Sequence, residues 1–186
     1  MRTRGCGRER RDMNRGTLAG AITWGGAAGL LGTAVMDLAI VGFFAAAGMP
    51  LGLIYSFIGD VAQQFFLRIG IEVPGGVPLG ALVHFLLGLT LGSVFGLAVS
   101  RIRRLRLGSV LKGALLGVLY IEIVSQPILV SAPLLVKMTT PDVIQWYVLS
   151  TSMHIIYVIV LGVVLALRQR RLARLSESSE LHVSGG

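Results

Sequence analysis

The sequence is poor in charged residues, since Asp, Glu, Lys and Arg together make up 14% of its 186 residues. Soluble domains carry about 25%, and with 54% hydrophobic residues and a mean hydropathy of +0.77 the chain is too apolar for that class. Cysteine is nearly absent as well, because Cys6 is the only one. This excludes an intramolecular disulfide and any cysteine-based metal cluster. The low charge indicates an integral membrane protein.

The motifs of common enzyme classes are also missing. There is no Walker loop, no nucleophile elbow and no HExxH pair. The stretch GCGRER at 5–10 resembles a dinucleotide fingerprint only superficially, because no strand precedes it. We therefore expect the protein not to be an enzyme. The net charge of +8 comes from basic tracts between apolar segments, so we expect membrane topology rather than nucleic acid to explain it.

Four apolar segments are long enough to cross a bilayer as helices, which takes about 20 residues each. They cover roughly residues 22–47, 78–100, 113–136 and 145–167. The sequence thus predicts an all-α, integral membrane four-helix bundle in one domain, residues 17–167, between a basic segment at 1–16 and a polar segment at 168–186. The first span is too long for a cleaved signal peptide, and Met13 is an alternative to Met1 as the translational start.

The connection between the first two spans predicts a further helix at about 54–69. Ile54, Ile58 and Val61 share one face and polar side chains the other, which is typical of an amphipathic helix that lies in the membrane interface. Trp24, Trp146 and Tyr147 are interpreted as ordinary interfacial anchors.

The basic residues predict the orientation of the chain. Fifteen Arg and Lys residues lie in the N-terminal segment, in the loop around Arg104 and in the C-terminal segment, whereas the other two connections hold only Arg68 and Lys137. Because cytoplasmic loops retain positive charge, we expect both termini in the cytoplasm and the helix at 54–69 outside.

The two halves of the chain align with each other. Placing AGLLGTAVMDLAI (28–40) on GALLGVLYIEIVS (113–125) puts Asp37 on Glu122, and aligning the second and fourth spans puts His84 on His154. Both halves begin on the same side of the membrane. This predicts a parallel two-helix internal repeat about an axis along the membrane normal.

The second span carries a row of small residues at every fourth position, interrupted once by a histidine: Gly80, His84, Gly88, Gly92, Gly96 and Ser100. In lipid, helices associate where small residues allow close approach. Gly80, Gly88, Gly92 and Gly96 are therefore predicted to form a helix-packing face. Since His84 lies on the same row, we expect it inside the bundle.

Four titratable residues within the spans are candidates for a polar core: Asp37, His84, Glu122 and His154. Ionisable groups inside a bilayer are costly and suggest a function. Three interpretations stay open: hydrogen bonds that fix helix packing, a proton path, or a b-type haem held by the two histidines. A metal site of two histidines and two carboxylates is chemically feasible, but no compact spacing motif supports it and no metal is predicted.

The third span contains the most polar intramembrane stretch, SQPILVSAP at 125–133. Pro127 lacks the N–H that would bond to the carbonyl of Ile123, which predicts a kink. Tyr120 and Gln126 are secondary candidates for lining a cavity.

Four segments carry a resemblance to a known group of proteins: GLLGTAVMDL and GMPLG in the first half, then HFLLGLTLGSVFGL and HIIYVIVLGVVL. They resemble the uncharacterised small four-span inner-membrane proteins of bacteria and archaea, including YagU-like ones, over most of residues 25–167. The resemblance implies a polytopic plasma-membrane protein and no established activity. We expect a membrane subunit or transporter-like bundle that packs with itself or with other membrane subunits. The alternative is an electron-transfer subunit with a b-type haem.

Overall fold

The computed structural model of the chain describes residues 5–102, 105, 107 and 109–184, with side chains described at 18–102, 105, 107, 109–172 and 174. It consists of five helices: α1 (Gly5–Ala46), α2 (Leu53–Arg68), α3 (Gly76–Arg101), α4 (Val110–Leu135) and α5 (Thr140–Ser184). Four stretches are long and apolar enough to cross a membrane: Leu18–Ala46, Gly76–Arg101, Val110–Leu135 and Thr140–Leu172. The predicted all-α fold with four candidate spans is confirmed. Arg103, Arg104 and Arg106 of the predicted basic loop lie outside the described residues, as do residues 1–4 and 185–186.

The first and last helices are longer than the sequence predicted. α1 already begins at Gly5 and α5 continues to Ser184, so the described parts of the two polar terminal segments extend the spanning helices. In the case of α5 the reason is plain, because residues 167–184 contain no glycine or proline that would end the helix.

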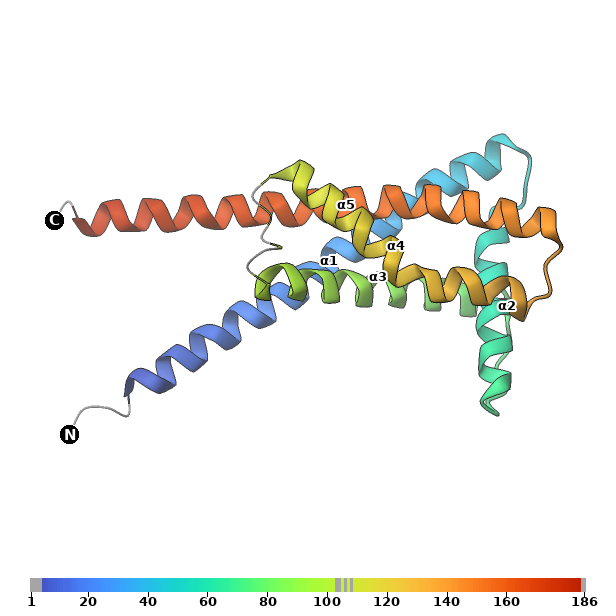
Figure 1. Ribbon diagram of the computed structural model, residues 1–186, viewed down its shortest axis with the longest axis horizontal. Helices are drawn as coiled ribbons and strands as arrows, with labels where there is room; N and C mark the ends of the chain where they lie inside the picture. Colours follow the sequence, from blue (N-terminus) through green and yellow to red (C-terminus); the bar gives the residue numbers. More distant parts are fainter. Residues whose placement is uncertain (1–4, 103–104, 106, 108, 185–186) are drawn as a thin grey trace.

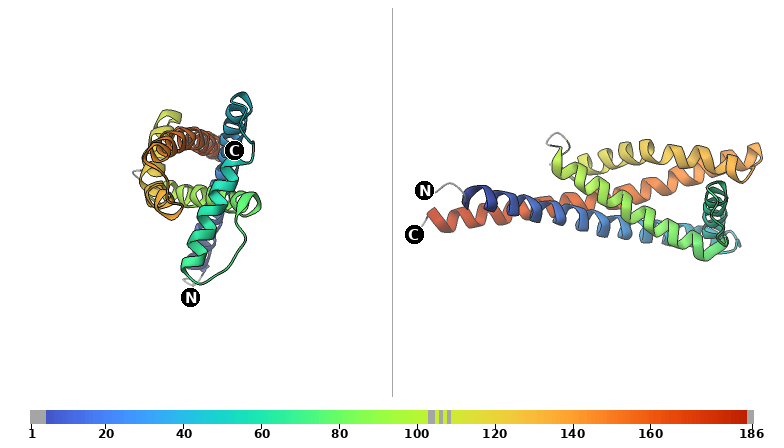
Figure 2. Two further views of the ribbon diagram at one scale, coloured as in Figure 1. Left: turned by 90° about the vertical axis from the view of Figure 1, so that its right-hand side faces the viewer. Right: turned by 90° about the horizontal axis from the view of Figure 1, so that it is seen from below.

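The four long helices run side by side along the long axis of the molecule (Figure 1). The start of α1, the end of α3, the start of α4 and the end of α5 lie toward one end of this bundle, and the α4–α5 connection lies at the other (Figure 1). α2 lies crosswise over this second end, which we call the α2 end (Figures 1 and 2). A crosswise amphipathic helix is the arrangement expected of a segment that lies in a membrane interface.

α1 and α3 form one tightly packed helix pair. A Cβ atom at Gly92 of α3 would lie only 2.7 Å from the Cα of Gly29 on α1, so the two backbones meet with no side chain between them. Gly80 faces α2 instead, where a Cβ atom would lie 2.8 Å from the nitrogen of Gly59. The four glycines of the predicted packing face are all buried: Gly80, Gly88, Gly92 and Gly96.

α4 and α5 form a second pair, and α1 joins it to the first. A Cβ atom at Gly162 of α5 would lie 2.6 Å from the carbonyl carbon of Gly113 on α4. α1 packs on α5 through Gly32, where a Cβ atom would lie 2.9 Å from the carbonyl oxygen of Tyr157. Between α3 and α4 the link is a long side chain, because the hydroxyl of Tyr120 donates to the carbonyl of Leu91 at 3.0 Å.

Away from the α2 end, apolar side chains fill the space between the two pairs: Phe95, Val99, Leu107, Leu161, Leu165 and Ala166. The ring of Phe95 packs on Tyr120 with a centroid distance of 5.1 Å. Leu107 of the α3–α4 connection is held because its N–H donates to the Gln169 side chain at 2.9 Å. This filled half fixes how the two pairs stand relative to each other at the α2 end.

Replacing Gly92 by leucine should force α1 and α3 apart, because the new side chain would need the space of the Gly29 backbone. We expect Gly92→Leu to lower the free energy of unfolding by about 3 kcal/mol or to prevent folding, as measured by detergent-induced unfolding in mixed micelles. Gly42→Leu is the control, since a Cβ atom at Gly42 meets nothing within 4 Å. Equal losses in both variants would contradict a packing role for the glycine row.

Candidate functional site

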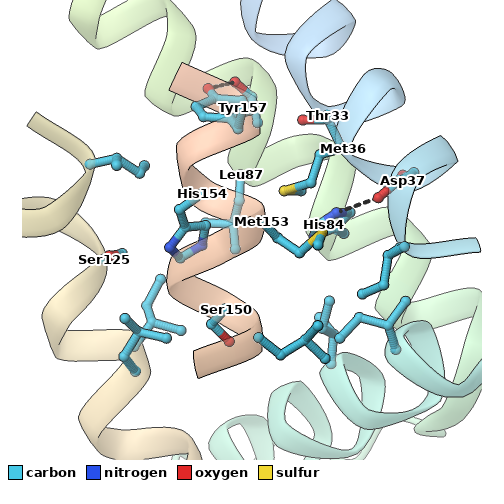
Figure 3. Close-up of a pocket in the computed structure, with 18 of the residues that line it drawn as sticks. Thr33, Met36, Asp37, His84, Leu87, Ser125, Ser150, Met153, His154 and Tyr157 are labelled. Carbon is cyan, nitrogen blue, oxygen red and sulfur yellow. Dashed lines mark hydrogen bonds and ion pairs between the residues drawn. The ribbon is translucent and has the colours of Figure 1, made fainter. Parts of the chain in front are cut away.

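A cavity lies between the two helix pairs at the α2 end (Figure 3). Its volume is about 130 Å³, and side chains from all five helices line it. Most of the wall is apolar. The polar residues among the lining are few: Thr33, Asp37, His84, Ser125, Trp146, Ser150, His154 and Tyr157. A concave, largely apolar space with a few polar groups is typical of a small-molecule site.

Asp37 on α1 joins three helices at the wall of this cavity. Its Oδ1 accepts a hydrogen bond from Nε2 of His84 on α3 at 2.9 Å (Figure 3). Its Oδ2 accepts one from the hydroxyl of Tyr55 on α2 at 2.7 Å. His84 lies one helical turn from Gly80 and one from Gly88, on the same face of α3. Because these glycines let α3 pack closely on α1 and α2, the imidazole lies within hydrogen-bonding distance of the carboxylate. Asp37 is 7% exposed, and the two hydrogen bonds offset the cost of burying it.

Tyr55 is a residue of this cluster that the sequence analysis missed. Burial, and then the hydrogen bond and negative charge of Asp37, raise the pKa of Tyr55 well above its ordinary value. The hydroxyl therefore keeps its proton at neutral pH and remains a donor. The sequence did contain a weak signal for a contact at this face of α2, because Gly59 lies four residues after Tyr55 on the same face. A glycine on one face of an amphipathic helix favours close contact with another helix.

His154 on α5 lines the same cavity but is not paired with a carboxylate. Its Nδ1 is buried and has no hydrogen-bond partner among the described residues. Glu122, the other acid of the predicted polar core, is not part of the cavity lining, and its carboxylate makes no hydrogen bond or ion pair in the described part of the chain. Since Ile121 points into the cavity, a rotation of about 100° per residue turns Glu122 away from it. The structure thus brings Asp37, His84 and His154 to one cavity and leaves Glu122 outside.

The secondary candidates on α4 do not line the cavity either. Tyr120 bridges to α3, and Gln126 is exposed. Ser125, which the sequence placed only in a polar stretch, is 4% exposed and does line it.

Trp146 stands between the cavity and a second, more open hollow of about 380 Å³ at the α2 end, and both hollows also share Ile54 and Leu149. The indole N–H donates to the carbonyl of Leu129 at 3.2 Å. That carbonyl is available because Pro133, one turn later on α4, has no N–H to bond it. The sequence identified Trp146 only as an interfacial anchor, whereas the structure also makes it part of the cavity wall.

The side chains present do not fit a metal or a b-type haem. Among the described residues, no group of three or more His, Cys, Asp or Glu side chains is placed to hold a metal ion. Nε2 of His84, the usual ligand atom for haem iron, is bonded to Asp37. The cavity is close in size to an engineered cavity of about 150 Å³ that binds benzene. A porphyrin has four pyrrole rings and is too large for a space of this size.

No family model, curated protein or solved structure matches this chain. The resemblance to the YagU-like proteins stays a prediction, because no match supports it. Inference about function therefore starts from the cavity and its side chains.

Replacing Tyr55 by phenylalanine should loosen α2 from α1. The change leaves Oδ2 of Asp37 without its donor, and a lost hydrogen bond to a charged group costs about 1.5–3 kcal/mol. We expect Tyr55→Phe to lower the free energy of unfolding by that amount and to speed amide hydrogen exchange within Leu53–Arg68.

Tyr147→Phe is the matched control, because the hydroxyl of Tyr147 makes no hydrogen bond to the described residues. If α2 were protected from exchange equally well in Tyr55→Phe and the parent protein, the Tyr55 hydroxyl would not be what holds α2.

Proposed function

We propose that the protein is a transporter-like membrane bundle, and not an enzyme, whose cavity at the α2 end binds a small, largely apolar molecule. The observation that carries this proposal is the cavity itself, about 130 Å³ between two otherwise tightly packed helix pairs. Protein interiors are close-packed and leave few spaces larger than a water molecule, so a space of this size is unusual. A bundle that served packing alone would gain stability by filling it.

Within this proposal Asp37 and His84 hold the cavity wall in place rather than pass protons. Both oxygens of Asp37 are engaged, one by His84 and one by Tyr55. A proton path would need groups within hydrogen-bonding reach of about 3.2 Å at each step, and among the described residues His154 has no such partner at Nδ1. The geometry therefore favours a positioning role over a relay.

The proposal places the α2 end outside and both termini in the cytoplasm, in the plasma membrane of a bacterium or archaeon. Of the 17 basic residues, fifteen lie in the two terminal segments or in the stretch from Arg101 to Lys112 around the α3–α4 connection. The start of α1, the end of α3, the start of α4 and the end of α5 all lie toward the same end of the bundle (Figure 1). The expected partners are the bilayer and a second copy of the chain or other membrane subunits.

We also infer that the two halves of the bundle are related as an internal repeat. The alignment of the halves puts Gly92 on Gly162, and each of these glycines lies against the backbone of the first helix of its own pair. The halves have diverged in their polar groups, since Asp37 bonds to His84 whereas Glu122 does not bond to His154 in the described structure.

Filling the cavity should abolish binding of a small aromatic probe. Leu87 lines the cavity, so Leu87→Trp should weaken binding of 4-fluorotoluene at least tenfold, as followed by ¹⁹F NMR with the protein in lipid nanodiscs. Leu86→Trp is the matched control, because Leu86 is 50% exposed on the outer surface of the same helix. If the parent protein and both variants gave the same fluorine signal, the cavity would not be a binding site.

The orientation can be tested by cysteine labelling of intact cells. In a Cys6→Ser background, Arg68→Cys and Lys137→Cys should react with a membrane-impermeant thiol reagent, and Arg101→Cys should react only after the cells are opened. The opposite pattern would reverse the proposed topology.

A further inference from the structure

Most of the polar groups around the cavity already have hydrogen-bond partners. The hydroxyl of Thr33 donates to the carbonyl of Gly29 at 3.0 Å. The hydroxyl of Tyr157 donates to the carbonyl of Gly88 at 2.9 Å, and both oxygens of Asp37 are taken. None of these groups needs a ligand.

Two side-chain atoms are buried without any partner among the described residues, namely Oγ of Ser125 and Nδ1 of His154. Both residues line the cavity. Ser125 on α4 and His154 on α5 point toward one another across the space between these helices (Figure 3). A buried polar atom without a partner is destabilising, and two such atoms face the same part of the cavity.

Resting on the binding function proposed above, we infer that the ligand is a phenol, a neutral aromatic ring with a hydroxyl group that Ser125 and His154 bind together. A hydroxyl group both donates and accepts. It can donate to Nδ1 of His154 while its oxygen accepts from the Ser125 hydroxyl. One ligand group thus satisfies both unpartnered atoms.

The ligand is neutral because the cavity offers no counter-charge. No lysine or arginine is among the lining residues. The one carboxylate, Asp37, has both oxygens engaged. A charged ligand in this low-dielectric space would have no ion-pair partner and would pay a large desolvation cost.

The size and walls of the cavity favour an aromatic ring. Its volume of about 130 Å³ is near that of a cavity known to admit benzene. Met36 and Met153 extend into the space (Figure 3), and thioether sulfur atoms make favourable contacts with aromatic rings. Water alone would satisfy the polar corner and leave the apolar remainder empty, since a buried water needs two to four polar partners.

The test compares 4-fluorophenol with 4-fluorotoluene, which has nearly the same shape and no hydroxyl. Binding of both probes to the full chain in nanodiscs is measured by ¹⁹F NMR, with Leu87→Trp as the blank for probe dissolved in lipid. The parent protein should bind 4-fluorophenol about tenfold or more tightly than 4-fluorotoluene. In ¹⁵N-histidine-labelled protein, 4-fluorophenol should shift the Nδ1 resonance of His154 and 4-fluorotoluene should not.

Ser125→Ala removes one of the two unpartnered atoms and should reduce the affinity for 4-fluorophenol about five- to tenfold, with that for 4-fluorotoluene unchanged. Ser131→Ala is the matched control on the same helix, because the Ser131 hydroxyl bonds the carbonyl of Ile128 and does not line the cavity. Equal affinity of the parent protein for the two probes would overturn the phenol inference and leave the binding function standing. Binding of neither probe would contradict the binding function itself.

Discussion

The backbone contact between α1 and α3 is the constraint on which the rest of the α2 end depends. Within a bilayer the hydrophobic effect does little to bring helices together, so association relies on close van der Waals packing and on hydrogen bonds between helices. Gly25 and Gly29 on α1 meet Gly92 and Gly96 on α3 with no side chain between them. At this separation the imidazole of His84 reaches the carboxylate on α1. Side chains in place of these glycines would push the helices apart and break that hydrogen bond.

The contacts of α3 with α4 and α5 are of a different kind from its contact with α1. Two tyrosines span the distance to α3, with Tyr120 of α4 bonding the carbonyl of Leu91 and Tyr157 of α5 bonding that of Gly88. A tyrosine keeps two backbones a ring's length apart, whereas a glycine lets them touch. The combination of glycine contacts on one side and tyrosine bridges on the other leaves room inside the bundle, and the polar ends of the tyrosines are satisfied by carbonyl groups of α3.

The sequence was sufficient for the four candidate spans and for part of the candidate site, but not for the extension of α1 and α5 into the polar terminal segments. The spans followed from composition and length, and His84 was placed inside the bundle because it shares a row with four glycines. The role expected of Glu122 did not follow in the same way. Aligning the halves pairs it with Asp37, but an alignment carries no information on how α4 is rotated, and the side chain of Ile121 faces the cavity instead. Tyr55 was missed because its partner Asp37 lies on another helix across a turn, and the local signal, Gly59 one turn later, indicates a helix contact without identifying its partner.

The position of Trp146 at the cavity wall makes it an intrinsic fluorescence probe of the cavity. The indole donates to the Leu129 carbonyl and packs on Phe57 at a centroid distance of 4.7 Å, so two protein contacts hold it at the cavity wall. The chain has one other tryptophan, Trp24, which is 50% exposed and lies beneath the Arg168 guanidinium, 5.3 Å from the ring centroid. With Trp24 changed to phenylalanine, the remaining fluorescence would come from a single indole at the cavity wall, and its emission would respond directly to occupancy.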